Sequence, residues 1–188
     1  MLTRGTPPAR TVVRSDPVAV LLPRPAPEAT VISAPAPNRS PMNDKRSAFL
    51  AAERPDDVAI YLSDEAVDDP ERLRSHGEPV AGGVVLVLDG ERGRSVFQTA
   101  TGVGAMAFAR EAMDRDGRVR ADLTGGDCPA AGEDDAAHAA RIVFAFVERQ
   151  QPDDDDRYGE GDVVHAYARC SCGEAYSDWW HAGDRDAE

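Results

Sequence analysis

The side chains best suited to chemistry in this chain of 188 residues are its three cysteines and the histidines around them. Cys170 and Cys172 flank a single serine, and Cys128 lies far upstream. Thiolates and imidazoles are the ligands that zinc prefers in closed, tetrahedral structural sites. The three cysteines with one histidine therefore predict a candidate Cys₃His zinc site, in which the metal would keep the thiols deprotonated.

The fourth ligand of such a site has three candidates. His165 is taken as the ligand, and His181 and His138 are the alternatives. Side chains alternate between the two faces of a regular strand, so His165 would reach Cys170 only if the strand bends. The Cys-Ser-Cys pair is also tighter than the usual C-x-x-C half-site of structural zinc.

Two other interpretations of the cysteines stay open. Cys170 and Cys172 could form a tight disulfide, or either could exchange with Cys128, as in a thiol oxidoreductase. The simplest interpretation, which the sequence favours, is that all three are small buried hydrophobic residues at the end of a core strand.

The element that must position Cys170 is a strand over residues 163–168, which are largely β-branched, aromatic or small and apolar. Because side chains alternate, Cys170 shares the face of Val164, and we expect that face to be buried. Gly173 follows Cys-Ser-Cys and can supply the positive φ of a turn. The sequence thus predicts a buried strand that delivers two thiols to a turn.

The remaining segments predict an α+β fold in one domain, residues 42–182, with an acidic tail over 183–188. We expect a mostly antiparallel sheet of four to five strands with two or three helices. The expected strands are 58–62, 84–88, 95–99, 142–147 and 163–168, and the expected helices are 44–53, 70–77 and 104–114. Asp89-Gly90 predicts a hairpin turn between the strands at 84–88 and 95–99. The four aspartates 153–156 are expected to lie in water, and they lack the alternating pattern of a calcium-binding loop.

Residues 1–41 differ in composition from the rest. They contain nine of the fourteen prolines, five arginines, two acids and no aromatic residue. Such a segment buries too little surface to offset its ordering entropy, so we expect a disordered extension. The charge reverses at Met42, which suggests that Met42 is the natural start and that the assigned start codon lies too far upstream.

The net charge of −13 limits the partners of the chain. Such a charge repels phosphates, so we expect no nucleic-acid partner. The apolar run at residues 18–22 is far shorter than a signal-peptide core or a membrane helix, so we expect no membrane partner and a cytoplasmic location. One lysine among 21 basic residues and an excess of acids fit a protein that stays soluble in high salt.

Motifs of common enzyme classes are absent from the sequence. Gly102-Val103-Gly104 lacks the residues that complete a phosphate loop, and there is no G-x-S-x-G or H-E-x-x-H motif. We therefore expect a non-enzymatic structural or interaction module, for which a protein partner is conceivable. Zinc is the one cofactor that the residues suggest.

The stretches KRSAFL at 45–50, RPDDVA at 54–59, GRSVFQ at 93–98 and CSCG at 170–173 carry a family resemblance. The chain resembles, from Met42 to about Trp179, a group of small acidic proteins of halophilic archaea with a domain of unknown function. The resemblance implies a halophilic, cytoplasmic origin and fits a start at Met42. It implies no activity, ligand or catalytic residue.

Overall fold

A six-stranded antiparallel sheet forms the centre of the computed structural model, which describes residues 41–132, 138–151 and 157–184. The strand order is β2-β3-β1-β6-β7-β8. The strands are β1 (Asp57–Ser63), β2 (Glu78–Val80), β3 (Gly83–Asp89), β6 (Ala140–Glu148), β7 (Val163–Cys170) and β8 (Ala175–His181). A second, two-stranded sheet pairs β4 (Arg118–Val119) with β5 (Gly126–Asp127).

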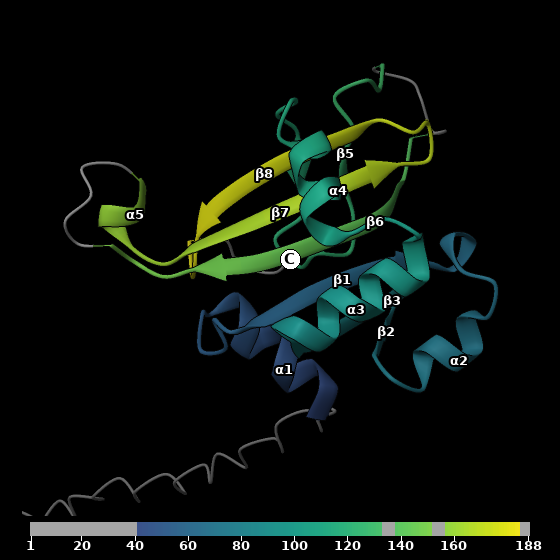
Figure 1. Ribbon diagram of the computed structural model, residues 1–188, viewed down its shortest axis with the longest axis horizontal. Helices are drawn as coiled ribbons and strands as arrows, with labels where there is room; N and C mark the ends of the chain where they lie inside the picture. Colours follow the sequence, from purple (N-terminus) through teal and green to yellow (C-terminus); the bar gives the residue numbers. More distant parts are fainter. Residues whose placement is uncertain (1–40, 133–137, 152–156, 185–188) are drawn as a thin grey trace, which may run out of the picture. The chain divides into compact units, whose positions relative to one another are not determined.

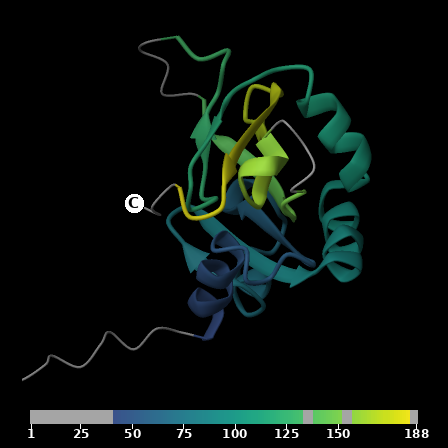
Figure 2. The same cartoon turned by 90° about the vertical axis from the view of Figure 1, so that its left-hand side faces the viewer.

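Helices cover both faces of the six-stranded sheet (Figures 1 and 2). They are α1 (Pro41–Leu50), α2 (Pro70–Arg74), α3 (Gly90–Thr101), α4 (Ala105–Ala112) and α5 (Arg157–Glu160), with a 3₁₀ turn η1 at Asp64–Ala66. Phe97 of α3 and Phe108 of α4 pack with Ile60 on one face. Phe49 of α1 packs with Ala59 on the other face, in a cluster that also contains Cys128 and Cys170. Because successive side chains of β1 point to opposite faces of the sheet, Ala59 and Ile60 belong to two separate hydrophobic layers.

The α+β class and the antiparallel sheet are confirmed. The sheet has one strand more than the largest expected number, because β2 and β8 were not expected whereas residues 95–99 do not form a strand. The described residues also contain five α-helices rather than two or three. The extra ones, α5 and the α3 helix discussed next, come from short or glycine-rich segments whose sequence pattern is weak.

The strand expected at residues 95–99 was wrong, because these residues lie in helix α3. Asp89 does not open a hairpin turn but caps the helix, and its carboxylate accepts hydrogen bonds from the backbone N–H groups of Glu91 and Arg92. Gly93 then faces β1 so closely that a Cβ atom there would lie 2.1 Å from Cγ2 of Val58. Gly93 is therefore a position where the helix rests directly on the sheet.

Several expectations fall on residues that the structure does not describe. They are residues 1–40 of the expected disordered extension, the aspartates at 153–156, and residues 185–188 of the acidic tail, and the expected start at Met42 is likewise untested. They stay predictions. Within the described ranges, no helix is both long enough and apolar enough to cross a membrane.

Candidate metal centre

Strand β7 delivers Cys170 to one end of the sheet, as its alternating pattern predicts. Val164, Ala166, Ala168 and Cys170 all belong to the hydrophobic cluster on the α1 face. The side chain of Cys170 is 2% exposed. The register is held from both sides, because β7 pairs with β6 and with β8 over nearly its whole length. The thiol of Cys170 is therefore fixed by a central strand.

The turn after β7 places Cys172 at the surface. Gly173 has φ +94°, the region that L side chains rarely adopt, and its N–H donates to the carbonyl of Cys170. The N–H of Ser171 donates to the carbonyl of Ala139, and the Ser171 hydroxyl accepts from the Ala139 N–H. These bonds tie the Cys-Ser-Cys turn to the segment that precedes β6.

His138 reaches the cysteines through the pairing of β6 with β7. Ala140 lies opposite Cys170, after a register irregularity between Ala140 and Ile142. Extending this antiparallel register outward brings residue 138 beside the turn that carries Cys172. Nδ1 of His138 lies 3.5 Å from Sγ of Cys170.

Cys128 comes from the β4–β5 hairpin, which is attached to the outer edge of β8. The N–H of Gly117 donates to the carbonyl of Ser177, and Asp178 accepts a hydrogen bond from the N–H of Val119. Cys128 directly follows β5 and is buried. Its Sγ lies 3.8 Å from Sγ of Cys172.

The four side chains form one compact group. One ligand atom from each of Cys128, His138, Cys170 and Cys172 lies within 4.8 Å of all the others. Two of the four residues are buried, His138 is half-buried, and Cys172 is exposed. Three segments of the chain therefore bring their ligand atoms close enough together to bind one ion.

The pKa values of the two buried thiols, Cys128 and Cys170, are shifted in opposite directions. Burial raises the pKa of Cys128 to about 11, aided by its position beside the two other thiols. Burial also acts to raise the pKa of Cys170, but hydrogen bonds from the Cys172 backbone, from Ser171 and from the other thiols lower it to about 7. One thiolate is thus favoured near neutral pH even before a metal binds.

Tyr176 places a buried hydroxyl next to this group. Its side chain is fully buried, and its hydroxyl has no hydrogen-bond partner among the described residues. Burial, together with the neighbouring Cys128 and Cys170, raises the pKa of Tyr176 well above its usual value. Gly126 makes room for it, since a Cβ there would lie 2.8 Å from the Tyr176 oxygen. A buried hydroxyl beside thiolates is a donor that a charged sulfur can use.

The structure places the other two candidate histidines elsewhere. His165 lies on the opposite face of β7 from Cys170, because the strand is regular and side chains alternate. Its Nε2 lies 3.4 Å from the Tyr158 hydroxyl and 3.4 Å from Oε2 of Glu148. His181, at the end of β8, lies beside Glu160 and Asp184. The fourth member of the group is thus His138, the last of the three alternatives.

Comparison with known protein families matches residues 77–183 to the family described as "Family of unknown function (DUF5807)". The matched segment covers more than half of the chain and includes all four members of the cysteine–histidine group. No curated protein and no solved structure matches the chain. The chain therefore belongs to the DUF5807 family, a family of unknown function.

Proposed function

We propose that Cys128, His138, Cys170 and Cys172 bind one zinc ion in a closed structural site. The ion would link the turn between β7 and β8 to the start of β6 and to the β4–β5 hairpin. The zinc would then be structural and not catalytic, because four protein ligands leave no position for a substrate or a reactive water. On this proposal the protein is a zinc-stabilised, non-enzymatic domain.

The observation that carries the proposal is the spacing of the ligand atoms. A tetrahedral ion with Zn–S bonds of about 2.3 Å and Zn–N bonds of about 2.0 Å separates two sulfurs by about 3.8 Å and a sulfur from a nitrogen by about 3.5 Å. Cys128 Sγ and Cys172 Sγ are 3.8 Å apart, and Cys170 Sγ and His138 Nδ1 are 3.5 Å apart. Both separations fit ligands of one tetrahedral zinc.

The site has a structural task because the segments that it joins have little regular structure of their own. Strands β4 and β5 contain two residues each. Such a short hairpin is at best marginally stable alone. A metal bound by thiolates contributes its binding free energy to folding. It would therefore fix the hairpin against the edge of the main sheet.

A thiol oxidation reaction is the second candidate function, favoured by the short distance between Cys128 and Cys172. Two thiols would lose two protons and two electrons to an oxidant such as hydrogen peroxide, which becomes two water molecules. The product would be a Cys128–Cys172 disulfide. Cysteines joined in a disulfide cannot bind zinc as thiolates, so at any moment the group can serve only one of the two functions.

The setting in which the domain works is also a proposal. The net charge of −13 and the scarcity of lysine support a protein adapted to the salt-rich cytoplasm of a halophilic archaeon. Salt at high concentration screens the repulsion among so many carboxylates.

Elemental analysis of untagged protein purified without chelators tests the zinc site. We expect about one zinc per chain, the stoichiometry of a closed four-ligand site. Cys170→Ser and His138→Gln should lose the metal, whereas His181→Gln, a matched histidine outside the group, should retain it. Replacement of zinc by cobalt should give the intense visible bands of a tetrahedral cobalt thiolate.

Metal-free protein that gains no zinc on titration would overturn the proposal. Equal zinc loss in the His138→Gln and His181→Gln variants would also contradict it, because only His138 belongs to the group. A Cys128–Cys172 disulfide that forms and is reduced reversibly in protein that never binds zinc would favour the thiol function instead.

A further inference from the structure

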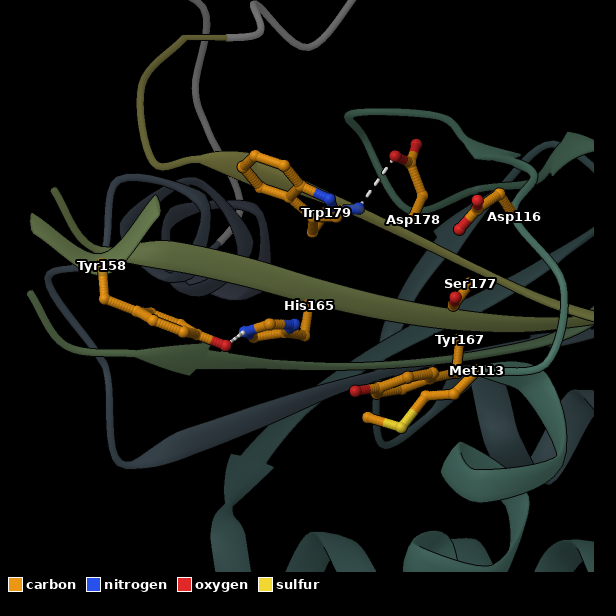
Figure 3. A pocket seen from close by; sticks show the side chains of 8 residues that line it. All are labelled: Met113, Asp116, Tyr158, His165, Tyr167, Ser177, Asp178 and Trp179. Carbon is orange, nitrogen blue, oxygen red and sulfur yellow. Dashed lines mark hydrogen bonds between the residues drawn. The ribbon is translucent and has the colours of Figure 1, made fainter. Parts of the chain in front are cut away.

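A pocket lies on the face of β7 and β8 opposite the cysteine–histidine group, between the end of α4 and the short helix α5 (Figure 3). Its volume is about 370 Å³, within the range of small-molecule sites. Its lining includes Asp116, Tyr158, His165, Tyr167, Ser177 and Trp179. We call it the Trp179 pocket.

The Trp179 pocket is remote from the proposed zinc site. His165 and Cys170 lie five residues apart on β7 and on opposite faces of the strand. A strand rises about 3.3 Å per residue, so their backbones are about 16 Å apart. The described residues that line the pocket and the members of the cysteine–histidine group do not overlap, so each proposal can fail without the other.

The charged side chains among the described lining residues are acidic. Asp116 and Asp178 line the pocket, and the described part of the lining contains neither lysine nor arginine. The Asp178 carboxylate accepts hydrogen bonds from the backbone N–H groups of Val119 and Trp179. A third carboxylate, Glu148, lies 3.4 Å from the His165 imidazole. The chain as a whole carries a net charge of −13. Such a field repels phosphates and carboxylates and raises the local concentration of cations.

Aromatic rings surround the same space. Figure 3 shows the rings of Tyr158, Tyr167 and Trp179 arranged around the pocket, with the Tyr158 hydroxyl directed at His165. The His165 ring stacks on Phe146, with ring centroids 5.1 Å apart, which fixes its orientation. Trp179 is 40% exposed, an unusual state for such a large hydrophobic side chain. The indole lies at the rim of the pocket, edge-on to the His181 ring with centroids 5.8 Å apart.

Aromatic faces and carboxylates together recognise one class of ligand. The negative face of an aromatic ring attracts a cation, and a weakly hydrated alkylammonium loses little when it leaves water. A hydrated metal ion would gain little from the rings, and a neutral ligand would lack both the cation–π attraction and the ionic attraction to the carboxylates. We propose that the Trp179 pocket binds a small organic cation with a methylated ammonium head group.

Choline serves as the probe, and its neutral isostere, in which carbon replaces the ammonium nitrogen, is the matched control. Titration of the full chain is followed by calorimetry and by the NMR signal of the Trp179 indole N–H. We expect saturable choline binding, and binding of the isostere weaker by about tenfold, because it lacks the cation–π and ionic attraction. Equal binding of the two compounds, or no saturation by choline, would overturn the proposal.

Variants locate the binding site. Asp116→Asn removes a carboxylate of the lining, and Asp114→Asn removes an exposed carboxylate two residues away that does not line the pocket. We expect the first to weaken choline binding about threefold and the second to leave it unchanged. Equal effects would show only a general response to net charge and would contradict the assignment.

The indole itself is tested by Trp179→Ala and by the more conservative Trp179→Phe. We expect weakening of choline binding by about fivefold in the alanine variant and partial retention in the phenylalanine variant, since a phenyl ring keeps part of the cation–π attraction. Both variants should keep the zinc content of the parent protein. Choline binding that is unaffected by loss of the ring would refute the role of Trp179.

Discussion

At the scale of single residues, the opposite acidities of Cys128 and Cys170 determine how zinc binding depends on pH. The pKa of Cys170 is lowered to about 7, and that of Cys128 is raised to about 11. Below about pH 7 a proton competes with the metal for the Cys170 thiolate. Near neutral pH the Cys128 thiol is protonated, so the metal must displace that proton as well. Zinc affinity should therefore fall as pH is lowered.

Competition titrations with a zinc chelator of known affinity, at about pH 6 and about pH 8, measure this dependence. Binding should be weaker at the lower pH and should release protons to an unbuffered solution. A zinc affinity that is the same at both values would contradict thiolate ligation.

The buried hydroxyl of Tyr176 gives a second prediction. This oxygen has no hydrogen-bond partner among the described residues, so its burial is unfavourable unless a metal-bound thiolate accepts from it. Tyr176→Phe should raise the free energy of unfolding of the metal-free protein by about 1 kcal/mol, the desolvation penalty of an unsatisfied group. Urea unfolding in the presence of a chelator measures it. A loss of stability would mean that the hydroxyl already has a partner in the metal-free state.

The residues of the candidate site could be predicted from the sequence only in part. The three cysteines are the obvious thiols, and the structure brings all three together. His138 could not be preferred over His165, because the choice depends on how β6 and β7 are paired. The sequence predicted both strands but not their pairing, so no register linked His138 to Cys172. The irregularity at Ala140 and Ile142 is invisible in the sequence.

At the scale of secondary-structure elements, the turn between β7 and β8 depends on Gly173. A side chain at its φ of +94° is strained. Gly173→Ala should lower the free energy of unfolding by about 1 kcal/mol and weaken zinc binding, because the turn carries Cys172.

Gly132→Ala is the control for this turn. A Cβ at Gly132 meets no atom within 4 Å, and its φ is not in the left-handed region. We expect it to be neutral or slightly stabilising. Thermal unfolding and zinc titration of both variants make the comparison. Equal effects at the two positions would argue against a special role for the turn.

Elements with strong patterns were predictable, and elements that depend on tertiary contact were not. The apolar strands around Ile60 and Phe144 and the capped helix at Pro70 appear where expected. Helix α3 was not predicted, because residues 95–99 were interpreted as a strand and the helix cap at Asp89 was interpreted as a turn. Its glycines fit because the helix rests on β1, a contact that the local sequence does not reveal.

At the scale of the whole molecule, the net charge of −13 predicts that stability depends on salt. Carboxylates that repel one another favour expansion, and added ions screen the repulsion. The thermal unfolding temperature should rise by several degrees on addition of potassium chloride. Sucrose at equal osmolality is the control, since it stabilises without screening charge. An equal rise in both solutions would indicate that screening is not the cause.

One edge of the main sheet limits how copies of the protein can associate. Strand β2 is an edge strand of only three residues, and its central residue is Pro79, which has no N–H to donate. An incoming strand would find too few donors there to continue the hydrogen-bonded ladder. Growth of fibrils by adding backbone to backbone is therefore blocked on that side, even in a crowded solution where the charges are screened.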